Sequence, residues 1–325
     1  MSPKASIPGL DFLKFFLALL IIVAHTQLFV EYPLLFHARE ELSSIAVPSF
    51  MAISAFLFFR KVYSLPKSDN PRPLLVKTVK RLAILFISWY ILMLPMTYFK
   101  FFSVATLKET IFAIFLSCTF NGYWFIKALL LNIVIFFICR RGAAFWLCIL
   151  LSWGIYLCSS YNYIFHYFDF PYHPYFSFYY HMGYFSVGVL LAKYGELIIH
   201  TRYTIHLVVC WLVLFVVDYL FASFSPLFRI LSIPITFILF YQMDLKEESQ
   251  NKTLREMSII LYMVQFVLIW IYDLCCNSFL DTTSVLFHTL QWSMTKSLVI
   301  LAVAILISVS ILHFSNKCKV LKYLY

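Results

Sequence analysis

The sequence predicts an all-α protein, a polytopic transmembrane helical bundle of about ten spans with both termini in the cytoplasm. Hydrophobic residues make up 62% of the chain and charged residues only 12%, whereas about a quarter of a soluble domain is charged. Apolar segments follow one another with short polar breaks and without a long linker rich in glycine, serine or proline. We therefore expect one domain over residues 1–325.

The number of spans follows from the length of the apolar segments, because a transmembrane helix needs roughly 17 to 25 mostly apolar residues. The first segment, 9–29, follows Lys4 as a signal peptide would, but it is too long and lacks a small-x-small cleavage site. We expect it to be retained. The other expected spans are 46–64, 78–97, 121–139, 143–160, 179–195, 203–221, 227–243, 258–276 and 292–313. The half-length piece 106–120 is expected to be re-entrant or interfacial.

Basic residues are distributed unequally between the two sides of the predicted bundle. If the N-terminus is cytoplasmic, most lysines and arginines fall in cytoplasmic loops. Apart from Lys14, the basic residues in the spans or on the external side are Arg39, Lys100, Lys108, Lys127, Arg229 and Lys296. The net charge of +10 is thus largely explained by topology and needs no nucleic acid. The cytoplasmic stretch "FFRKVYSLPKSDNPRPLLVKTVKR" (58–81) holds seven basic residues and one acid. It either anchors the protein near anionic lipid or also binds a phosphorylated ligand.

The first span, "GLDFLKFFLALLIIVAHT" (9–26), contains ionisable residues. Lys14 and His25 are eleven residues apart, which places them on one helical face about 16 Å apart along the axis. Asp11 lies near that face and is expected to pair with Lys14. A buried histidine is often only a packing residue. Here, lysine at the cytoplasmic mouth with a titratable group deep on the same stripe indicates a path for an anionic ligand that ends at a general base.

These residues resemble the acyltransferase 3 family of integral membrane O-acyltransferases, which includes bacterial enzymes that acetylate surface polysaccharides. The family motif is arginine or lysine, ten intervening residues and histidine, and "GLDFLKFFLALLIIVAH" carries it through Lys14 and His25. Ala55 stands where glycine is common and Gln265 where a late histidine often occurs. Four later stretches resemble the family in order: "VPSFMAISAFLFFRK" (47–61), "KTVKRLAILFISWY" (77–90), "YWFIKALLLNIVIF" (123–136) and "MSIILYMVQF" (257–266).

The resemblance implies a bacterial inner-membrane enzyme that uses acetyl-CoA or another acyl-CoA as co-substrate, without a further cofactor. His25 would remove the proton from an acceptor hydroxyl of a cell-surface glycan or its lipid-linked precursor as that hydroxyl attacks the thioester. The phosphates of the donor would be held by Lys14 together with Arg72, Lys77, Lys80 and Arg81. Lysine at position 14 is a point charge without the bidentate fork of arginine.

Four further residues are candidates for substrate contact. Ser258, Tyr262 and Gln265 recur at i, i+4 and i+7 and form one polar stripe, which is expected to face the bundle interior. Trp124 is either a substrate contact or an interfacial anchor. The aromatic segment 161–183 is interpreted as an interfacial belt. Its three histidines have no metal-ligand spacing, and the eight cysteines form no C-x-x-C pair, so a zinc site or disulfide framework is not expected.

Two other functions remain open on the sequence. A transporter or flippase would use the intramembrane histidine and lysine for coupling, although such proteins favour internal repeats and helices broken by glycine or proline, and this chain has only seven glycines. A non-catalytic relative would keep the fold and bind lipid or CoA.

Overall fold

The computed structural model describes residues 7–66, 68–97, 124–161, 178–198, 204–221, 225–243, 245, 249–279, 292–315 and 317–325. Within these ranges every regular element is helical. The predicted piece 106–120 and most of the aromatic segment 161–183 lie outside the described residues.

All ten expected spans coincide with α-helices. They are α1 (Pro8–His25), α3 (Ala46–Tyr63), α4 (Arg72–Thr97), α6 (Trp124–Ile138), α7 (Gly142–Ser160), α9 (Met182–Ile198), α10 (Thr204–Leu220), α11 (Ser225–Tyr241), α12 (Ser249–Phe279) and α14 (Ser293–Ser315). Five described segments are long and apolar enough to cross a membrane: α1, α7, α14, residues 251–278 of α12, and residues 33–63 around α3. The helical membrane bundle is confirmed, and the number of helices that cross the bilayer stays a prediction.

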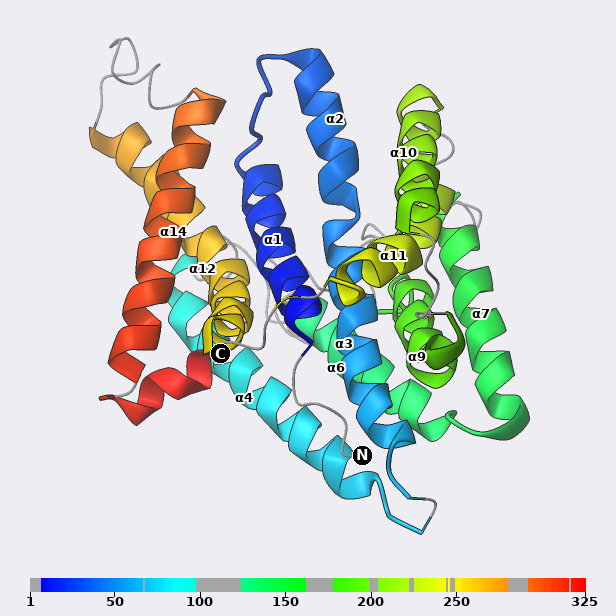
Figure 1. Cartoon of the computed structure of the whole chain (residues 1–325). Coiled ribbons are helices and arrows are strands. Elements are labelled where there is room, and N and C mark those ends of the chain that lie inside the picture. Colours follow the sequence, from blue (N-terminus) through cyan, green and yellow to red (C-terminus); the bar gives the residue numbers. More distant parts are fainter. Residues whose placement is uncertain are drawn as a thin grey trace, which may run out of the picture.

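Two of the helices in the described ranges were not predicted. α2 (Pro33–Ser44) precedes α3, with only Ile45 between them, and Figure 1 shows the two helices following one another beside α1. Its sequence "PLLFHAREELSS" mixes charges with apolar residues, so it does not resemble a span, yet it begins with a proline at its first helical position. The second is the short 3₁₀ helix η4 (Lys319–Leu324) at the end of the chain.

Close packing of α3 against α9 forms part of the core. Ala52 and Ala55 on α3 are fully buried. A Cβ atom added to Gly188 of α9 would lie 2.0 Å from the carbonyl oxygen of Ala52. Small residues at such a contact let two backbones approach closely, which is how transmembrane helices associate without a hydrophobic driving force between them.

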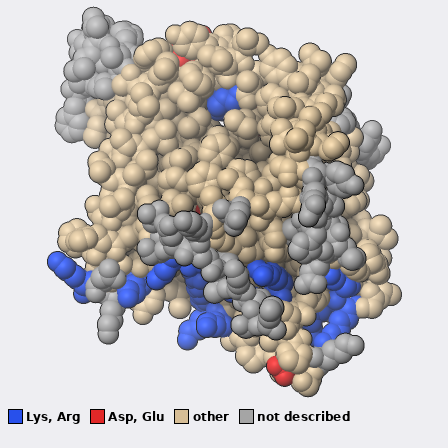
Figure 2. Space-filling view, viewed as in Figure 1, with Lys and Arg blue, Asp and Glu red and all other residues tan. Residues whose placement is uncertain are grey.

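The charges divide the molecule into two ends. Figure 2 shows lysine and arginine side chains gathered along the lower edge of the molecule. In Figure 1 the same edge holds the start of α1 and the end of α14, with α4 running obliquely across it. We call this the basic end and the opposite side the far end. The positive-inside rule would place the basic end in the cytoplasm.

Candidate active site

α1 carries Lys14 and His25 on the face that packs against the bundle. Ala18 and Ile21 lie on the same face between them and are 0% and 3% exposed. The Lys14 side chain is 12% exposed, whereas His25 is exposed as the last residue of the helix. Its imidazole is therefore accessible to a ligand. The ring lies 4.8 Å from the ring of Phe266 on α12, measured between centroids.

The lower part of α1 is joined to α12 by charge. Asp11 is 2% exposed, and its carboxylate lies 3.9 Å from the ammonium of Lys14, so the predicted pair is confirmed. The guanidinium of Arg255 lies 3.7 Å from the same carboxylate, a contact that was not predicted. One buried carboxylate thus offsets two cations. Without it, both cations would lie next to each other at the membrane boundary, which is costly.

The predicted phosphate-binding residues separate into two groups along α4. Lys77, Lys80 and Arg81 line one cavity of about 260 Å³. Arg81 also acts electrostatically on Lys14, which links this cavity to the lower end of α1. Arg72, at the first turn of α4, does not line that cavity.

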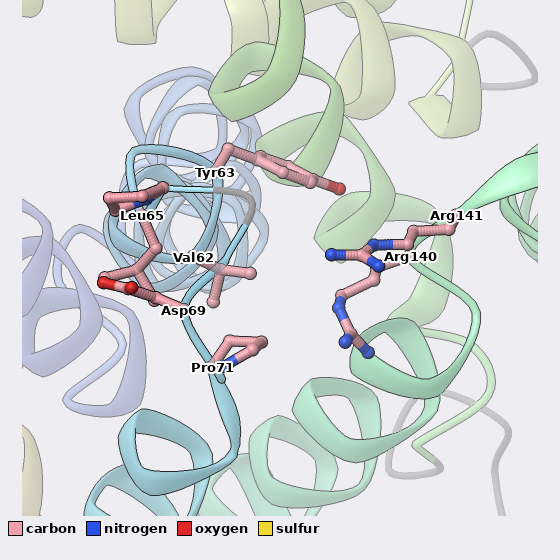
Figure 3. Close-up of a pocket in the computed structure, with 8 residues that line it drawn as sticks. Val62, Tyr63, Leu65, Asp69, Pro71, Arg140 and Arg141 are labelled. Carbon is pink, nitrogen blue, oxygen red and sulfur yellow. The ribbon is translucent and has the colours of Figure 1, made fainter.

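A second cavity at the basic end, of about 160 Å³, lies between the α3–α4 connection and the turn from α6 to α7. Figure 3 shows the Tyr63 side chain facing those of Arg140 and Arg141 across it, while the Asp69 carboxylate points away. Burial, together with Arg141 and Arg72, lowers the pKa of the Arg140 guanidinium. Arg72 thus belongs to a second cluster of cations, on the side of the basic end formed by α6 and α7.

The polar stripe of α12 faces the interior, as predicted. Ser258 and Gln265 are 0% exposed and Tyr262 is 8% exposed. The Ser258 hydroxyl donates to the carbonyl of Arg255 (2.7 Å), and the Gln265 amide donates to the carbonyl of Tyr262 (3.0 Å). The amide oxygen of Gln265 is buried without a partner among the described residues. Gln265 is next in sequence to Phe266, whose ring contacts that of His25.

Trp124 is an interior residue. It is 6% exposed, and its indole stacks on the ring of His181 with centroids 4.6 Å apart. The neighbouring Phe125 places its ring 5.3 Å from that of Tyr262. His181 is 0% exposed, so its assignment to an interfacial belt was wrong. The stack on Trp124 explains why: this histidine lies in the turn immediately before α9, where its ring packs inside the bundle.

The connection that follows His25 is held in an unusual backbone conformation. Gln27 and Phe29 have positive φ angles of 56° and 67°, which residues other than glycine seldom adopt. Side chains from α14 stabilise this turn: the hydroxyl oxygens of Thr26 and Ser297 lie 2.6 Å apart. Strained backbone of this kind is often found at functional sites, where the surrounding structure enforces it.

Glu31 extends the contact between this connection and α14. Its carboxylate accepts hydrogen bonds from the backbone amide (2.8 Å) and the hydroxyl of Ser293. Desolvation raises the pKa of Glu31, but these bonds outweigh it and hold the pKa below its ordinary value. Asp273 of α12 pairs with Lys296 of α14 at 2.6 Å. The end of α1 is thereby fixed against α14 by polar contacts.

Arg39 is the neighbour of His25 that the sequence did not single out. It is 6% exposed, and its Nε donates to the carbonyl of Leu28 at 3.3 Å. The guanidinium pairs with Glu40 and lies 4.2 Å above the ring of Phe36. Arg39 and Glu40 both act electrostatically on His25. One terminal guanidinium nitrogen is buried without a partner among the described residues. A buried cation of this kind can stabilise negative charge that develops beside a general base.

Asp218 of α10 lies in a further polar cluster. It is 0% exposed and contacts the carboxyl group of Glu41 on α2, with Arg229 acting on the same carboxyl group. The cluster ties α2 to α10 and α11.

Comparison with protein families gives a match that covers nearly the whole chain. The acyltransferase 3 family, described as an acyltransferase domain, matches residues 7–317. Searches of the curated proteins and of the solved structures found no match. The matched range includes Lys14, His25, the α4 cations and the α12 stripe. The chain therefore belongs to the acyltransferase 3 family of integral membrane acyltransferases.

Proposed function

We propose that this acyltransferase moves an acyl group, such as acetyl, from a cytoplasmic acyl-CoA to a hydroxyl of a cell-surface glycan or its lipid-linked precursor. The observation that carries the proposal is the pair of ionisable residues on α1. Lys14 lies among the cations of the basic end, and His25 ends the same helical face with an accessible imidazole. A donor and an acceptor that approach from opposite sides of a membrane need this separation in depth.

The basic end suits a donor with several phosphates. Lys61, Arg81 and Arg255 all act on Lys14, and α4 adds exposed lysines beside them. Cations bind phosphate oxygens through short charge-assisted hydrogen bonds. If this end faces the cytoplasm, as its charge favours, these cations meet acyl-CoA where it is made.

The chemistry assigned to His25 is general base catalysis. Its neutral imidazole nitrogen accepts the proton of the acceptor hydroxyl while the hydroxyl oxygen attacks the thioester carbonyl carbon. The tetrahedral intermediate then collapses, the carbon–sulfur bond breaks, and the departing CoA thiolate takes the proton. An ester and free CoA result. Ala18 and Ile21 are buried on the face between Lys14 and His25.

Replacing α4 cations tests the donor assignment. The double variant Lys80→Gln with Arg81→Gln is expected to weaken acetyl-CoA binding by about tenfold, because each exposed charge contact contributes on the order of 1 kcal/mol or less. Insertion into the membrane should be unchanged, since many basic residues remain at this end. Binding is measured by titration calorimetry on protein purified in detergent.

A matched pair of lysines at the same end serves as the control. Lys252 and Lys317 are exposed and line neither of the two cavities described above. The double variant Lys252→Gln with Lys317→Gln removes the same charge and should bind acetyl-CoA as the wild type does. Equal weakening by both double variants would mean that only the overall charge matters, and the α4 assignment would be wrong.

A further inference from the structure

The end of the chain is folded back onto α4. η4 lies between α4 and α14, and two side-chain hydrogen bonds hold it there. The indole of Trp89 on α4 donates to the carbonyl of Leu324 at 2.9 Å, and the hydroxyl of Tyr325 donates to that of Ser315 at 2.9 Å. The family match ends at residue 317, so this segment lies beyond the part of the chain that the family defines.

The fold of this segment completes a cavity. Of the eight residues that line the cavity of about 260 Å³, five belong to α4 and three to the end of the chain: Lys77, Lys80, Arg81, Ile84 and Leu85, with Lys322, Tyr323 and Tyr325. Four of them are cationic and none is acidic. The cavity therefore has a positive potential that suits a ligand with several negative charges.

The two tyrosines of the cavity differ in whether the side chain is held by a hydrogen bond or exposed. Tyr325 is tethered through its hydroxyl to Ser315. Tyr323 is 54% exposed and belongs to the short helix η4, whose C-terminal end is held by the bonds of Leu324 and Tyr325, the two residues that follow Tyr323. It therefore presents an aromatic face from a positioned backbone, beside lysines. An aromatic ring next to cations matches a planar base that carries phosphates.

We propose that this cavity binds the phosphoadenosine end of the acyl-CoA, with Tyr323 stacked on the adenine and Lys322 sharing the phosphates with the cations of α4. The inference rests on the proposed donor and adds the end of the chain to its site. An anionic lipid headgroup offers the same phosphate chemistry, but it has no base for Tyr323. Arg81 lines this cavity and also acts electrostatically on Lys14. A donor bound in the cavity would therefore extend its pantetheine arm toward the lower end of α1.

The test measures the affinity of purified protein for four probes: CoA, dephospho-CoA, adenosine 3′,5′-bisphosphate and 4′-phosphopantetheine. Tyr323→Ala should weaken binding of CoA and of the bisphosphate by about tenfold, the usual effect of losing an aromatic stack on a base. It should leave 4′-phosphopantetheine, which has no base, unchanged. Tyr323→Trp should bind CoA like the wild type, and Lys322→Gln should reduce the preference for CoA over dephospho-CoA and flatten the dependence of CoA affinity on salt.

Two variants outside the cavity serve as matched controls. Lys317→Gln removes an exposed lysine near the same segment, and Tyr32→Ala removes a tyrosine that is 46% exposed in the connection after α1. Both should bind every probe as the wild type does. Size-exclusion profiles of all variants identify any that have lost the fold. The Tyr323→Trp variant keeps an aromatic ring at this position, so normal CoA binding by it shows that substitution alone does not disrupt the site.

The outcomes separate this inference from the proposed function. If Tyr323→Ala binds CoA and the bisphosphate normally while Lys80→Gln with Arg81→Gln binds CoA weakly, the donor assignment stands and the role of Tyr323 is wrong. If Tyr323→Ala weakens 4′-phosphopantetheine as much as CoA, adenine stacking is excluded. If the cavity binds anionic lipid but neither CoA nor the bisphosphate, the inference is also wrong. If the wild type binds neither CoA nor the bisphosphate, the proposed donor itself is wrong.

Discussion

His25→Ala is expected to abolish acyl transfer while the protein still folds and binds acyl-CoA. The substitution removes the only group on α1 that can accept a proton near the far end, and loss of a general base typically lowers the rate about 10²- to 10⁴-fold. Its structural cost should be small, because His25 is exposed at the end of its helix. The substitution removes the ring contact of His25 with Phe266. The measurement is glycan acylation by mass spectrometry in membranes with matched protein levels.

Two further variants separate catalysis from other causes. Lys14→Ala should mainly weaken donor binding, because Lys14 lies among the cations of the basic end. His37→Ala removes another histidine, whose side chain is 42% exposed and contacts Tyr219, and it should leave transfer unchanged. Transfer near the wild-type level by His25→Ala would rule out the proposed mechanism. A loss explained by missing protein would make His25 a structural residue.

Gly188→Ala is expected to destabilise the protein strongly. The added Cβ would lie 2.0 Å from the carbonyl oxygen of Ala52 and 2.8 Å from the Cβ of Ala55. A backbone carbonyl cannot move aside as a flexible side chain can, so α3 and α9 must separate along their contact. Overpacking in a core ordinarily costs about 1 to 3 kcal/mol, and we expect a value at or above the top of that range. Thermal unfolding of purified protein in detergent measures the effect.

Gly154→Ala is the matched control for this prediction. Gly154 also lies inside a helix, α7, but nothing lies within 4 Å of the Cβ that alanine would add. Alanine there should be neutral or should stabilise the protein by roughly 0.5 to 1 kcal/mol, the ordinary difference in helix propensity. If Gly188→Ala unfolds at the same temperature as Gly154→Ala, the close contact between α3 and α9 is not as the structure describes it.

The helices and the two ends of α1 could be predicted from the sequence because both depend on local pattern. Apolar runs of sufficient length specify the helices, and the spacing of eleven residues places Lys14 and His25 on one face. Asp11 was found in the same way, because residues three apart on a helix are neighbours. The sequence also indicated that Ser258, Tyr262 and Gln265 face inward, since polar residues on an apolar helix seldom face lipid.

The remaining features depend on contacts between distant segments. Arg255 reaches Asp11 only because α12 packs along α1. Arg39 comes close to His25 because α2 is a helix that returns toward α1, and its mixed sequence does not distinguish it from a loop. The sequence marks Arg39 in one way only: it is among the few basic residues that lie outside the basic end. Hydropathy likewise does not reveal that Arg72 and Arg81 line different sides of the basic end, or that Gly188 touches Ala52.

The central claim is that the acyl group enters at the basic end, from the cytoplasm, and leaves at the far end. Sealed membrane vesicles of known orientation test it directly, because radiolabelled acetyl-CoA does not cross a bilayer. Inside-out vesicles that contain the wild-type protein and its glycan acceptor should transfer label to the glycan when the donor is added outside, and the His25→Ala variant should not. Right-side-out vesicles should transfer none until they are permeabilised. Equal labelling in intact right-side-out vesicles would contradict the account.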